Sequence, residues 1–190
     1  GADIGAVSGF GLPTSLFGTV ESANAITAQC VIDVQLAYNQ LLSTPQTIFG
    51  HPPAFGGGET VLPGVYQEAG AGSLGGNLTL DGQGDPNAIF IFKFGGAFNT
   101  GAASNVIMIN GTQSCNVFWI SAGAVAMGAG TQFKGTLIAS PGAVSMAIGG
   151  ILEGRMLSTS GAVAVDQVLI IAPCITADTT LQPLNLECIG

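Results

Sequence analysis

Three pentapeptides decide the fold: Gly123-Ala-Val-Ala-Met127, Gly142-Ala-Val-Ser-Met146 and Gly161-Ala-Val-Ala-Val165. Their opening glycines stand at positions 123, 142 and 161, so the interval is the same both times. The spacing persists outside the pentapeptides, since Lys134-Gly135 is followed at the same interval by Glu153-Gly154. Units of equal length that keep their phase indicate an internal repeat.

A unit of this length is too short for two helices and suits one coil of a β-solenoid with three short strands. We expect strands near Val117–Ile120, Ala124–Met127 and Gln132–Lys134, separated by corners of Gly, Ala or Pro. Because side chains alternate along a strand, every second residue points inward and stacks on its equivalent in the next coil. The predicted inward ladders are Phe118/Leu137/Met156, Val125/Val144/Val163, Met127/Met146/Val165 and Phe133/Leu152/Ile171.

Outward columns follow from the same alternation. Lys134 and Glu153 share one such column and should lie about 4.8 Å apart on neighbouring coils, where opposite charges are tolerated.

The β pattern continues upstream of the repeat, but with less regular spacing. Further strands or turns are expected at Val61–Tyr66, Asn77–Leu80, Asp81–Pro86 (a turn), Ala88–Phe94 and Gly95–Thr100, after a linking loop over residues 45–58.

One segment breaks the β pattern. Residues 22–42 contain neither Gly nor Pro, and apolar residues recur at steps of three and four, which predicts one amphipathic helix over about 22–43. The outward column Trp119, Ile138 and Leu157 would be an adhesive patch if left bare, so we place the helix over it. The predicted apolar stripe of the helix is Ile26, Cys30, Val34, Ala37 and Leu41.

The composition limits the classes of function. The chain has 190 residues, 30 of them glycine, and only 7% are charged, which suits one domain with many tight turns. A net charge of −8 from 3 Lys+Arg and 11 Asp+Glu argues against nucleic acid and anionic membrane surfaces as partners. Apolar runs are strand-sized, so no membrane insertion is expected, and the start without Met suggests that any targeting segment has been removed.

Four cysteines, Cys30, Cys115, Cys174 and Cys188, are an even number in a chain poor in charge, which favours disulfides and an extracellular location over buried thiols. Cys174 and Cys188 bracket a short tail, so a local bridge between them is our first pairing. By elimination Cys30 would then meet Cys115. None of the cysteine spacings resembles a zinc site.

The residues that chemistry requires are nearly missing. His51 stands in a Pro/Gly loop and is interpreted as a solvated loop histidine rather than a catalytic one. Asp81 and Asp85 suggest a calcium loop, but glycines and Pro86 suffice to explain a turn there. We therefore expect no cofactor, no metal and no enzymatic activity.

What remains is a surface of small residues on the second strand of each coil. It is flat, almost uncharged and repeated at about 4.8 Å. Three explanations compete. The surface packs against another copy or a partner, it is a plane that orders water against a crystalline lattice, or it is solvent-exposed solenoid surface with no binding role. Its outward residues are Ala97, Asn99, Gly101, Ala124, Ala126, Gly128, Ala143, Ser145, Ala147, Ala162, Ala164 and Asp166.

Several long strings carry a resemblance to a known family. They are Asn77-Leu-Thr-Leu-Asp-Gly-Gln-Gly-Asp-Pro-Asn-Ala-Ile-Phe-Ile-Phe-Lys-Phe94, Ile109-Asn-Gly-Thr-Gln-Ser-Cys-Asn-Val-Phe-Trp119, Lys134-Gly-Thr-Leu-Ile-Ala139, Glu153-Gly-Arg-Met-Leu157, Ala37-Tyr-Asn39 and Leu62-Pro-Gly-Val-Tyr66. Over about residues 1–172 the chain resembles the microbial ice-binding proteins. The resemblance implies a right-handed, roughly triangular β-solenoid with one long helix alongside. It also implies secretion or surface attachment, and ice as the partner of one flat face that bears short Thr/Ala/Gly/Ser motifs.

Two functions follow as expectations. The first is a secreted protein that adsorbs to ice through the small-residue face and inhibits ice growth or recrystallisation. The second is an extracellular filament or matrix subunit that self-associates through the ends of the solenoid. In both, residues 1–172 form one domain, and the tail 173–190 caps the last coil or donates a strand to a neighbour.

Overall fold

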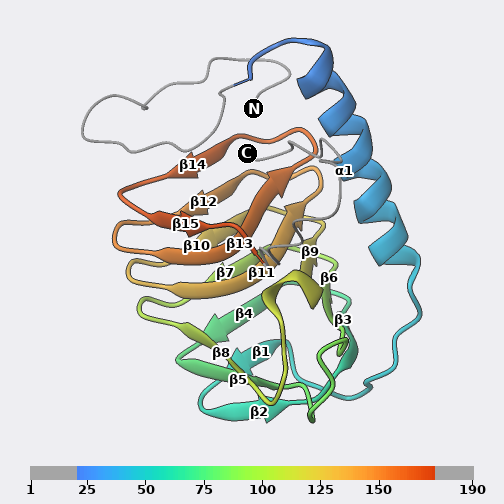
Figure 1. Ribbon diagram of the computed structural model, residues 1–190, viewed down its shortest axis with the longest axis vertical. Helices are drawn as coiled ribbons and strands as arrows, with labels where there is room; N and C mark the ends of the chain where they lie inside the picture. Colours follow the sequence, from blue (N-terminus) through green and yellow to red (C-terminus); the bar gives the residue numbers. More distant parts are fainter. Residues whose placement is uncertain (1–20, 174–190) are drawn as a thin grey trace, which may run out of the picture.

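The fold is described by a computed structural model over residues 21–173, in which one helix precedes a long series of short strands (Figure 1). The helix α1 spans Ala25–Ser43. The strands are β1 (Ala54–Gly56), β2 (Glu59–Val61), β3 (Gly64–Glu68), β4 (Gly72–Gly75), β5 (Asn77–Asp81), β6 (Phe90–Phe94), β7 (Phe98–Thr100), β8 (Asn105–Ile109), β9 (Val117–Ser121), β10 (Val125–Met127), β11 (Gln132–Ala139), β12 (Val144–Met146), β13 (Ile151–Ser158), β14 (Val163–Val165) and β15 (Leu169–Ile171), with a 3-10 turn η1 (Ser114–Asn116) before β9.

Every strand pairing is parallel, and the chain passes from sheet to sheet in a repeating order. Strands β1, β4, β7, β10, β12 and β14 form a six-stranded sheet, while the others form a sheet in the order β2-β5-β8-β11-β9-β6-β3, extended by β13 and β15. We call one circuit through both sheets a coil, so β1–β3 form the first coil and β14–β15 the last. Figure 1 shows the coils stacked from β1 and β2 at the bottom to β14 at the top. The prediction of a mainly β fold with one helix is confirmed.

Two of the predicted ladders are confirmed in full. Val125, Val144 and Val163 are in register, as are Met127, Met146 and Val165. In the other two ladders the pairs Leu137/Met156 and Phe133/Leu152 are in register as expected. Lys134 and Glu153 are also aligned, and Lys134 Nζ lies 2.7 Å from Glu153 Oε2.

The remaining members of those two ladders are wrong by one residue. Leu137 pairs with Trp119 rather than with Phe118, and Trp119 is only 1% exposed, with its indole N–H donated to the Lys134 carbonyl at 3.0 Å. Leu152 pairs with Ile170 rather than with Ile171. The link from β11 to β12 is one residue longer than that from β9 to β10, and the link from β12 to β13 is one residue longer than that from β14 to β15. A shift of one residue moves a side chain to the opposite face of a strand.

The helix lies along the outer side of β9, β11 and β13, as predicted, and it covers Ile138 and Leu157 of the predicted column, with Ile120 in the place of Trp119. Val34 and Tyr38 pack against Ile120 and Ile138, whereas Trp119 belongs to the interior. Leu157 completes the contact as expected. The predicted stripe is confirmed at Val34, Ala37 and Leu41 but is wrong at Ile26, which is 48% exposed, because Thr27 is the buried residue of the first turn.

Both ends of the helix are fixed by hydrogen bonds. At the start, the Asn24 side chain accepts from the Thr27 amide at 3.0 Å, and Thr27 Oγ1 accepts from the Asn24 amide, which is a capping box. At the end, Lys93 on β6 donates to the carbonyls of Leu42 (3.1 Å) and Thr44 (2.7 Å). Lys93 is buried, and this desolvation lowers the pKa of its ammonium group.

The interior changes character along the stack. Coils one to three are filled by aromatic rings, and Trp119 stacks on Phe92 with ring centroids 3.9 Å apart. Phe133 on β11 is the last ring of this series, and the core beyond it is filled by Val, Leu and Met. Two details of the first coil differ from the predictions. The expected loop 45–58 contains β1, and the expected strand Val61–Tyr66 is divided between β2 and β3 by a corner at Leu62 and Pro63.

Candidate functional site

The six-stranded sheet brings the predicted small residues together in straight columns. Its central column consists of residues that share one register position in six successive strands. Ser145 is half-buried, and the other five are exposed. The column is Ala54, Ser73, Asn99, Ala126, Ser145 and Ala164.

Two flanking columns continue this flat surface beyond the strand ends. On one side lie Ala97, Ala124, Ala143 and Ala162. Their alignment follows from main-chain hydrogen bonds, such as Val125 N to Ala143 O (2.8 Å) and Val144 N to Ala162 O (2.9 Å). On the other side lie Gly101, Gly128, Ala147 and Asp166, aligned through bonds such as Ala147 N to Met127 O (3.0 Å). Every predicted residue of the small-residue surface therefore lies on one face.

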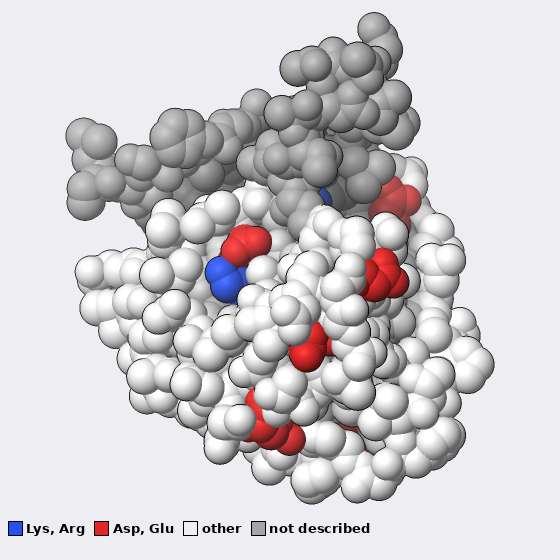
Figure 2. Space-filling view, turned by 60° about the horizontal axis from the view of Figure 1, so that its bottom comes forward, with Lys and Arg blue, Asp and Glu red and all other residues white. Residues whose placement is uncertain are grey.

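This flat face carries almost no charge and little relief. Asp166, at its edge in the last coil, is the one charged residue in the three columns. A shallow trough of about 430 Å³ runs between the central column and this edge, lined by Ala126, Ser145, Ala147 and Ala164 among others. Charge is sparse elsewhere too, since the side of the molecule in Figure 2 is mostly uncharged. Such a face offers few groups that bind water strongly as individuals.

The outward side of β2, β5, β8, β11 and β13 differs from the flat face. Its columns include Thr60, Thr79 and Ile107 and then the ion pair of Lys134 with Glu153. The Glu153 pKa is held below its ordinary value, first by the hydrogen bond from Lys134 and next by that from Ser114 Oγ at 2.7 Å. Bulky and charged side chains alternate here, so this second face is neither flat nor uncharged.

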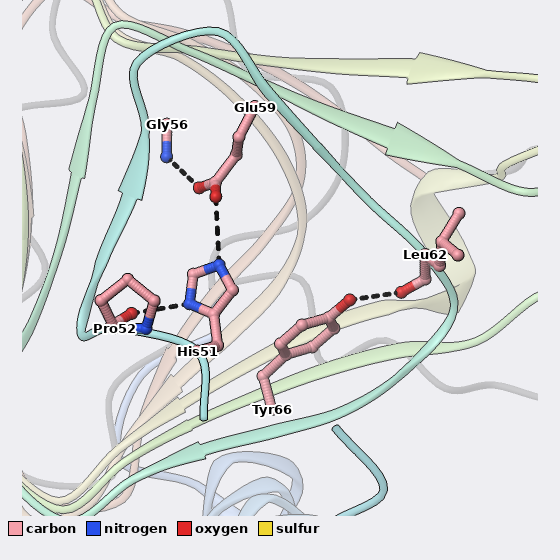
Figure 3. Close-up of polar contacts among 6 residues, drawn as sticks. All are labelled: His51, Pro52, Gly56, Glu59, Leu62 and Tyr66. Atoms are coloured by element: carbon pink, nitrogen blue, oxygen red, sulfur yellow. Dashed lines mark hydrogen bonds and ion pairs between the residues drawn. The ribbon is translucent and has the colours of Figure 1, made fainter. Parts of the chain in front are cut away.

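His51 is not the solvated loop residue that its sequence context suggests. Its ring stacks on Phe55 with centroids 4.1 Å apart and meets Tyr66 edge-on at 5.5 Å. Its nitrogens lie 3.1 Å from Glu59 Oε2 and 2.6 Å from the Pro52 carbonyl oxygen (Figure 3). The side chain is 14% exposed and closes the first coil. The aromatic Phe55 and the acidic Glu59 downstream were the signal that could have identified this cap.

The turn at Asp81–Pro86 is confirmed as a turn, and its carboxylates are occupied by local hydrogen bonds. Asp81 Oδ1 accepts from the Gln83 amide and from the Asn110 side chain, and Asp85 Oδ1 accepts from the Asn87 amide. Within residues 21–173, no group of three or more His, Cys, Asp or Glu side chains converges as metal ligands do.

The cysteines divide between the described and the undescribed parts of the chain. Cys30 and Cys115 are both disulfide-bonded. Cys174 and Cys188 lie outside the described residues, as does most of the tail 173–190, so the predicted pairing stays a prediction. Among the helices in residues 21–173, none has the length and hydropathy needed to cross a bilayer.

Comparison with known proteins identifies the family. The sequence model of the Ice-binding-like family matches residues 3–171, nearly the whole chain. The chain belongs to the ice-binding-like family. An ice-binding protein of Nostoc sp. (strain HG1) is 34% identical over 119 residues, and ice-binding protein 1 of Shewanella frigidimarina is 38% identical over 108 residues.

A solved structure shows the same fold. The ice-binding protein of an Antarctic Flavobacteriaceae bacterium superposes with a TM-score of 0.81 at 37% identity, over 85% of this chain. The chain spans less than half the length of these relatives: 42% of the Nostoc protein, 12% of the Shewanella protein and 38% of the Flavobacteriaceae chain. The relatives therefore contain segments that this chain does not match.

Proposed function

We propose that this protein adsorbs to ice through the flat face of the six-stranded sheet and inhibits ice growth or recrystallisation. The observation that carries the proposal is the register of that sheet, which places Asn99, Ala126, Ser145 and their neighbours in straight, evenly spaced columns. Family membership supports ice as the partner. Adsorption requires no reaction, which agrees with a surface almost without titratable groups.

The physical basis is a rigid, weakly hydrated plane. Strands repeat at about 4.8 Å along each column, so water between the small side chains can adopt one regular arrangement instead of separate hydration shells. Ala and Gly lose no side-chain rotamers on contact, and the stacked core already fixes the backbone. Little conformational entropy is then lost when the face meets the lattice.

The proposal includes the architecture of the whole domain and the location of the protein. We infer that residues 1–172 form one right-handed β-solenoid of roughly triangular cross-section, because three strands follow one another in each of the first three coils and the long strands β11 and β13 take the place of two strands in later ones. We also propose that the protein works outside the cell or at its surface. The low charge and the disulfide-bonded Cys30 and Cys115 support this location.

The test is thermal hysteresis and ice-recrystallisation inhibition by the purified chain and by Ala126→Tyr and Ser145→Tyr variants. A bulky ring in the central column lifts the face away from the lattice, so both variants should lose activity while keeping the wild-type circular dichroism spectrum. Thr79→Tyr on the second face is the matched control and should remain active. Loss of activity only in Thr79→Tyr would move the site to the second face, and an inactive wild type would reject the proposal.

The alternative function is an extracellular filament or matrix subunit. It is favoured by the last coil, where apolar side chains such as Val163 (45% exposed) and Leu169 (55% exposed) remain accessible at the end of the stack. Size determination separates the two functions: a monodisperse monomer at neutral pH supports ice adsorption, whereas long fibres support assembly.

A further inference from the structure

Three buried hydroxyl groups, those of Thr100, Ser104 and Thr131, lie along the edge of the flat face that contains Gly101 and Gly128. Thr100 occupies an inward position of β7 where the neighbouring coils have Leu74 and Met127. Thr131 and Ser104 lie at the corners that follow β10 and β7, and both are 0% exposed. Apolar residues fill the position equivalent to Thr100 in the other coils, so closing the core does not require a hydroxyl here.

Two of these hydroxyls, those of Thr100 and Thr131, form a closed hydrogen-bonded ring with the main chain of Gly128. The Gly128 amide donates to Thr100 Oγ1 at 3.0 Å, and Thr100 Oγ1 lies 2.9 Å from Thr131 Oγ1; with the Thr131 hydrogen on the Gly128 carbonyl, the Thr100 hydroxyl is the donor of this pair. Thr131 Oγ1 in turn donates to the Gly128 carbonyl at 2.7 Å. The ring begins and ends on Gly128, which is a residue of the flat face. Because each hydroxyl both donates and accepts, the bonds polarise one another.

Ser104 makes the corresponding bonds one coil earlier. Its hydroxyl lies 2.8 Å from the Gly101 carbonyl and 3.1 Å from the Leu74 carbonyl of the preceding coil. The corner that it closes contains Ala103 at φ +54°, in the left-handed region that favours glycine. A local hydrogen bond to Gly101 offsets that strain and keeps the corner in place.

The next corner lacks this arrangement. Gly150 stands there at the position of Thr131, and Met127 takes the place of Thr100 in the coil before it, so neither residue has a hydroxyl. Its left-handed position is Gly149, which adopts φ +75° without steric cost. The chain therefore uses buried hydroxyls at two central corners beside the flat face, and glycine alone at the corner that follows.

We propose that Thr100, Ser104 and Thr131 are positioning residues for adsorption to ice. Their hydroxyls hold the Gly101 and Gly128 corners against the sheet, so that the flat face stays planar up to its edge. This inference rests on the proposed function. A corner that shifts by a fraction of an ångström would leave the interior closed but would break the plane that the lattice must match.

The test compares three variants in which hydroxyls are changed with little change of shape. Thr131→Val breaks the ring, Thr131→Ser keeps the hydroxyl, and Thr112→Val is the control. Thr112 is matched to Ser104, since its Oγ1 lies 2.9 Å from the Ile109 carbonyl three residues earlier and 3.0 Å from the Leu80 carbonyl of the preceding coil. Thr112 lies in the corner between β8 and β9. Neither strand belongs to the six-stranded sheet, so this corner is away from the flat face.

We expect Thr131→Val to reduce thermal hysteresis to roughly half of the wild-type value or less, while remaining folded at the assay temperature. Amide exchange at Gly128 should accelerate by up to about tenfold, because Thr131→Val removes the bond to the Gly128 carbonyl and leaves Thr100, the acceptor of the Gly128 amide, without its hydroxyl partner. Thr131→Ser and Thr112→Val should keep wild-type thermal hysteresis. Full activity of Thr131→Val, or an equal loss in Thr112→Val, would overturn the inference.

Failure of the proposed function is distinguishable from failure of this inference. An inactive wild type rejects ice adsorption, and the ice assays then say nothing of the corners. Exchange at Gly128 still decides whether the hydroxyl ring holds its corner. Unchanged exchange in Thr131→Val would contradict the positioning role whatever the wild type does.

Discussion

The same corner of the stack is built in two ways. In coils two and three, the links from β5 to β6 and from β8 to β9 are loops, which stack on one another through bonds such as Asn116 Nδ2 to the Pro86 carbonyl (3.1 Å). In the later coils there is no loop, because β11 and β13 continue through the corner with a single glycine, Gly135 or Gly154. A Cβ on Gly135 would lie 2.5 Å from the Val117 carbonyl oxygen below it.

The difference divides the molecule into a looped half, β1 to β9, and a regular half, β10 to β15. The looped half holds most of the aromatic rings of the core. Its second and third coils are long and unequal, from Ser73 to Asn99 and from Asn99 to Ala126, whereas its first coil, from Ala54 to Ser73, is as short as those of the regular half. The regular half is filled by Val, Leu and Met apart from Phe133 on β11, and its coils are equal in length, from Ala126 to Ser145 and on to Ala164. The flat face crosses both halves without a break, so its register is independent of how the far corner is built.

The largest effect is expected in the aromatic interior. Trp119→Ala should destabilise the fold by about 3–5 kcal/mol, because a large ring stacked on Phe92 leaves a cavity that its neighbours cannot fill. Met146→Ala in the regular half should cost less, about 2–3 kcal/mol, because flexible aliphatic neighbours relax into the space. Urea denaturation measures both. Equal losses would show that the two interiors do not differ in rigidity.

The glycine corner should be nearly as sensitive. Gly135→Ala meets the Val117 carbonyl and forces φ +107° on a residue with a side chain, so we expect about 2 kcal/mol or more of destabilisation. Gly75→Ala in β4 is the control, because a Cβ there has open space around it, and its effect should stay within about 0.5 kcal/mol. Thermal unfolding measures the stability of both variants. If Gly135→Ala were as stable as the wild type, the corner at Gly135 would not be tightly stacked on the coil below.

The helix is fixed to the looped half by Lys93. Lys93→Met removes both hydrogen bonds to the Leu42 and Thr44 carbonyls and should destabilise the protein by about 1–3 kcal/mol. Amide exchange should accelerate first in the last turn of α1, while the contact of Val34 with Ile138 in the middle of the helix stays protected. Uniform loss of protection along the helix would contradict a local role for Lys93.

The smallest expected effect is a dependence on acid pH that links the two halves. Glu153 in β13 accepts from Ser114 in the looped half and from Lys134, and its pKa is lowered. A carboxyl whose pKa is lower in the folded state stabilises the fold above its unfolded pKa of about 4.3, and this contribution is lost as pH falls through the folded value.

Glu153→Gln should therefore be less stable by about 0.5–1 kcal/mol at neutral pH and show a flatter decline in stability below pH of about 4. Glu68→Gln is the control, since Glu68 has no ion pair among the described residues. Urea denaturation at several pH values measures how steeply the free energy of unfolding of each protein depends on pH. Parallel wild-type and Glu153→Gln curves would exclude the ion pair as a contributor.

Much of the fold could be predicted from the sequence because one period repeats in it. The ladder of Val125, Val144 and Val163 follows directly from the spacing, and the flat face follows from alternation around that ladder. The helix follows from its lack of Gly and Pro. These features depend on local periodicity alone.

The errors arise where corners differ by one residue. The link between β11 and β12 contains Pro141 and is one residue longer than that between β9 and β10, so the step from Trp119 to Leu137 is one residue shorter than that from Val125 to Val144. A periodic pattern cannot reveal which corner holds the extra residue. The interpretation of His51 is wrong for another reason: Phe55 and Glu59 stand close to it in the sequence, but only the fold brings Tyr66 against its ring.

The central claim is that ice meets the flat face, and partition into a slowly growing ice crystal tests it most directly. Fluorescently labelled wild type, Ala126→Tyr and Thr79→Tyr would be frozen under identical conditions, and the fraction of each that enters the ice measured. We predict that wild type and Thr79→Tyr are enriched in the ice while Ala126→Tyr stays in the liquid. Enrichment of Ala126→Tyr to the wild-type level would contradict the account.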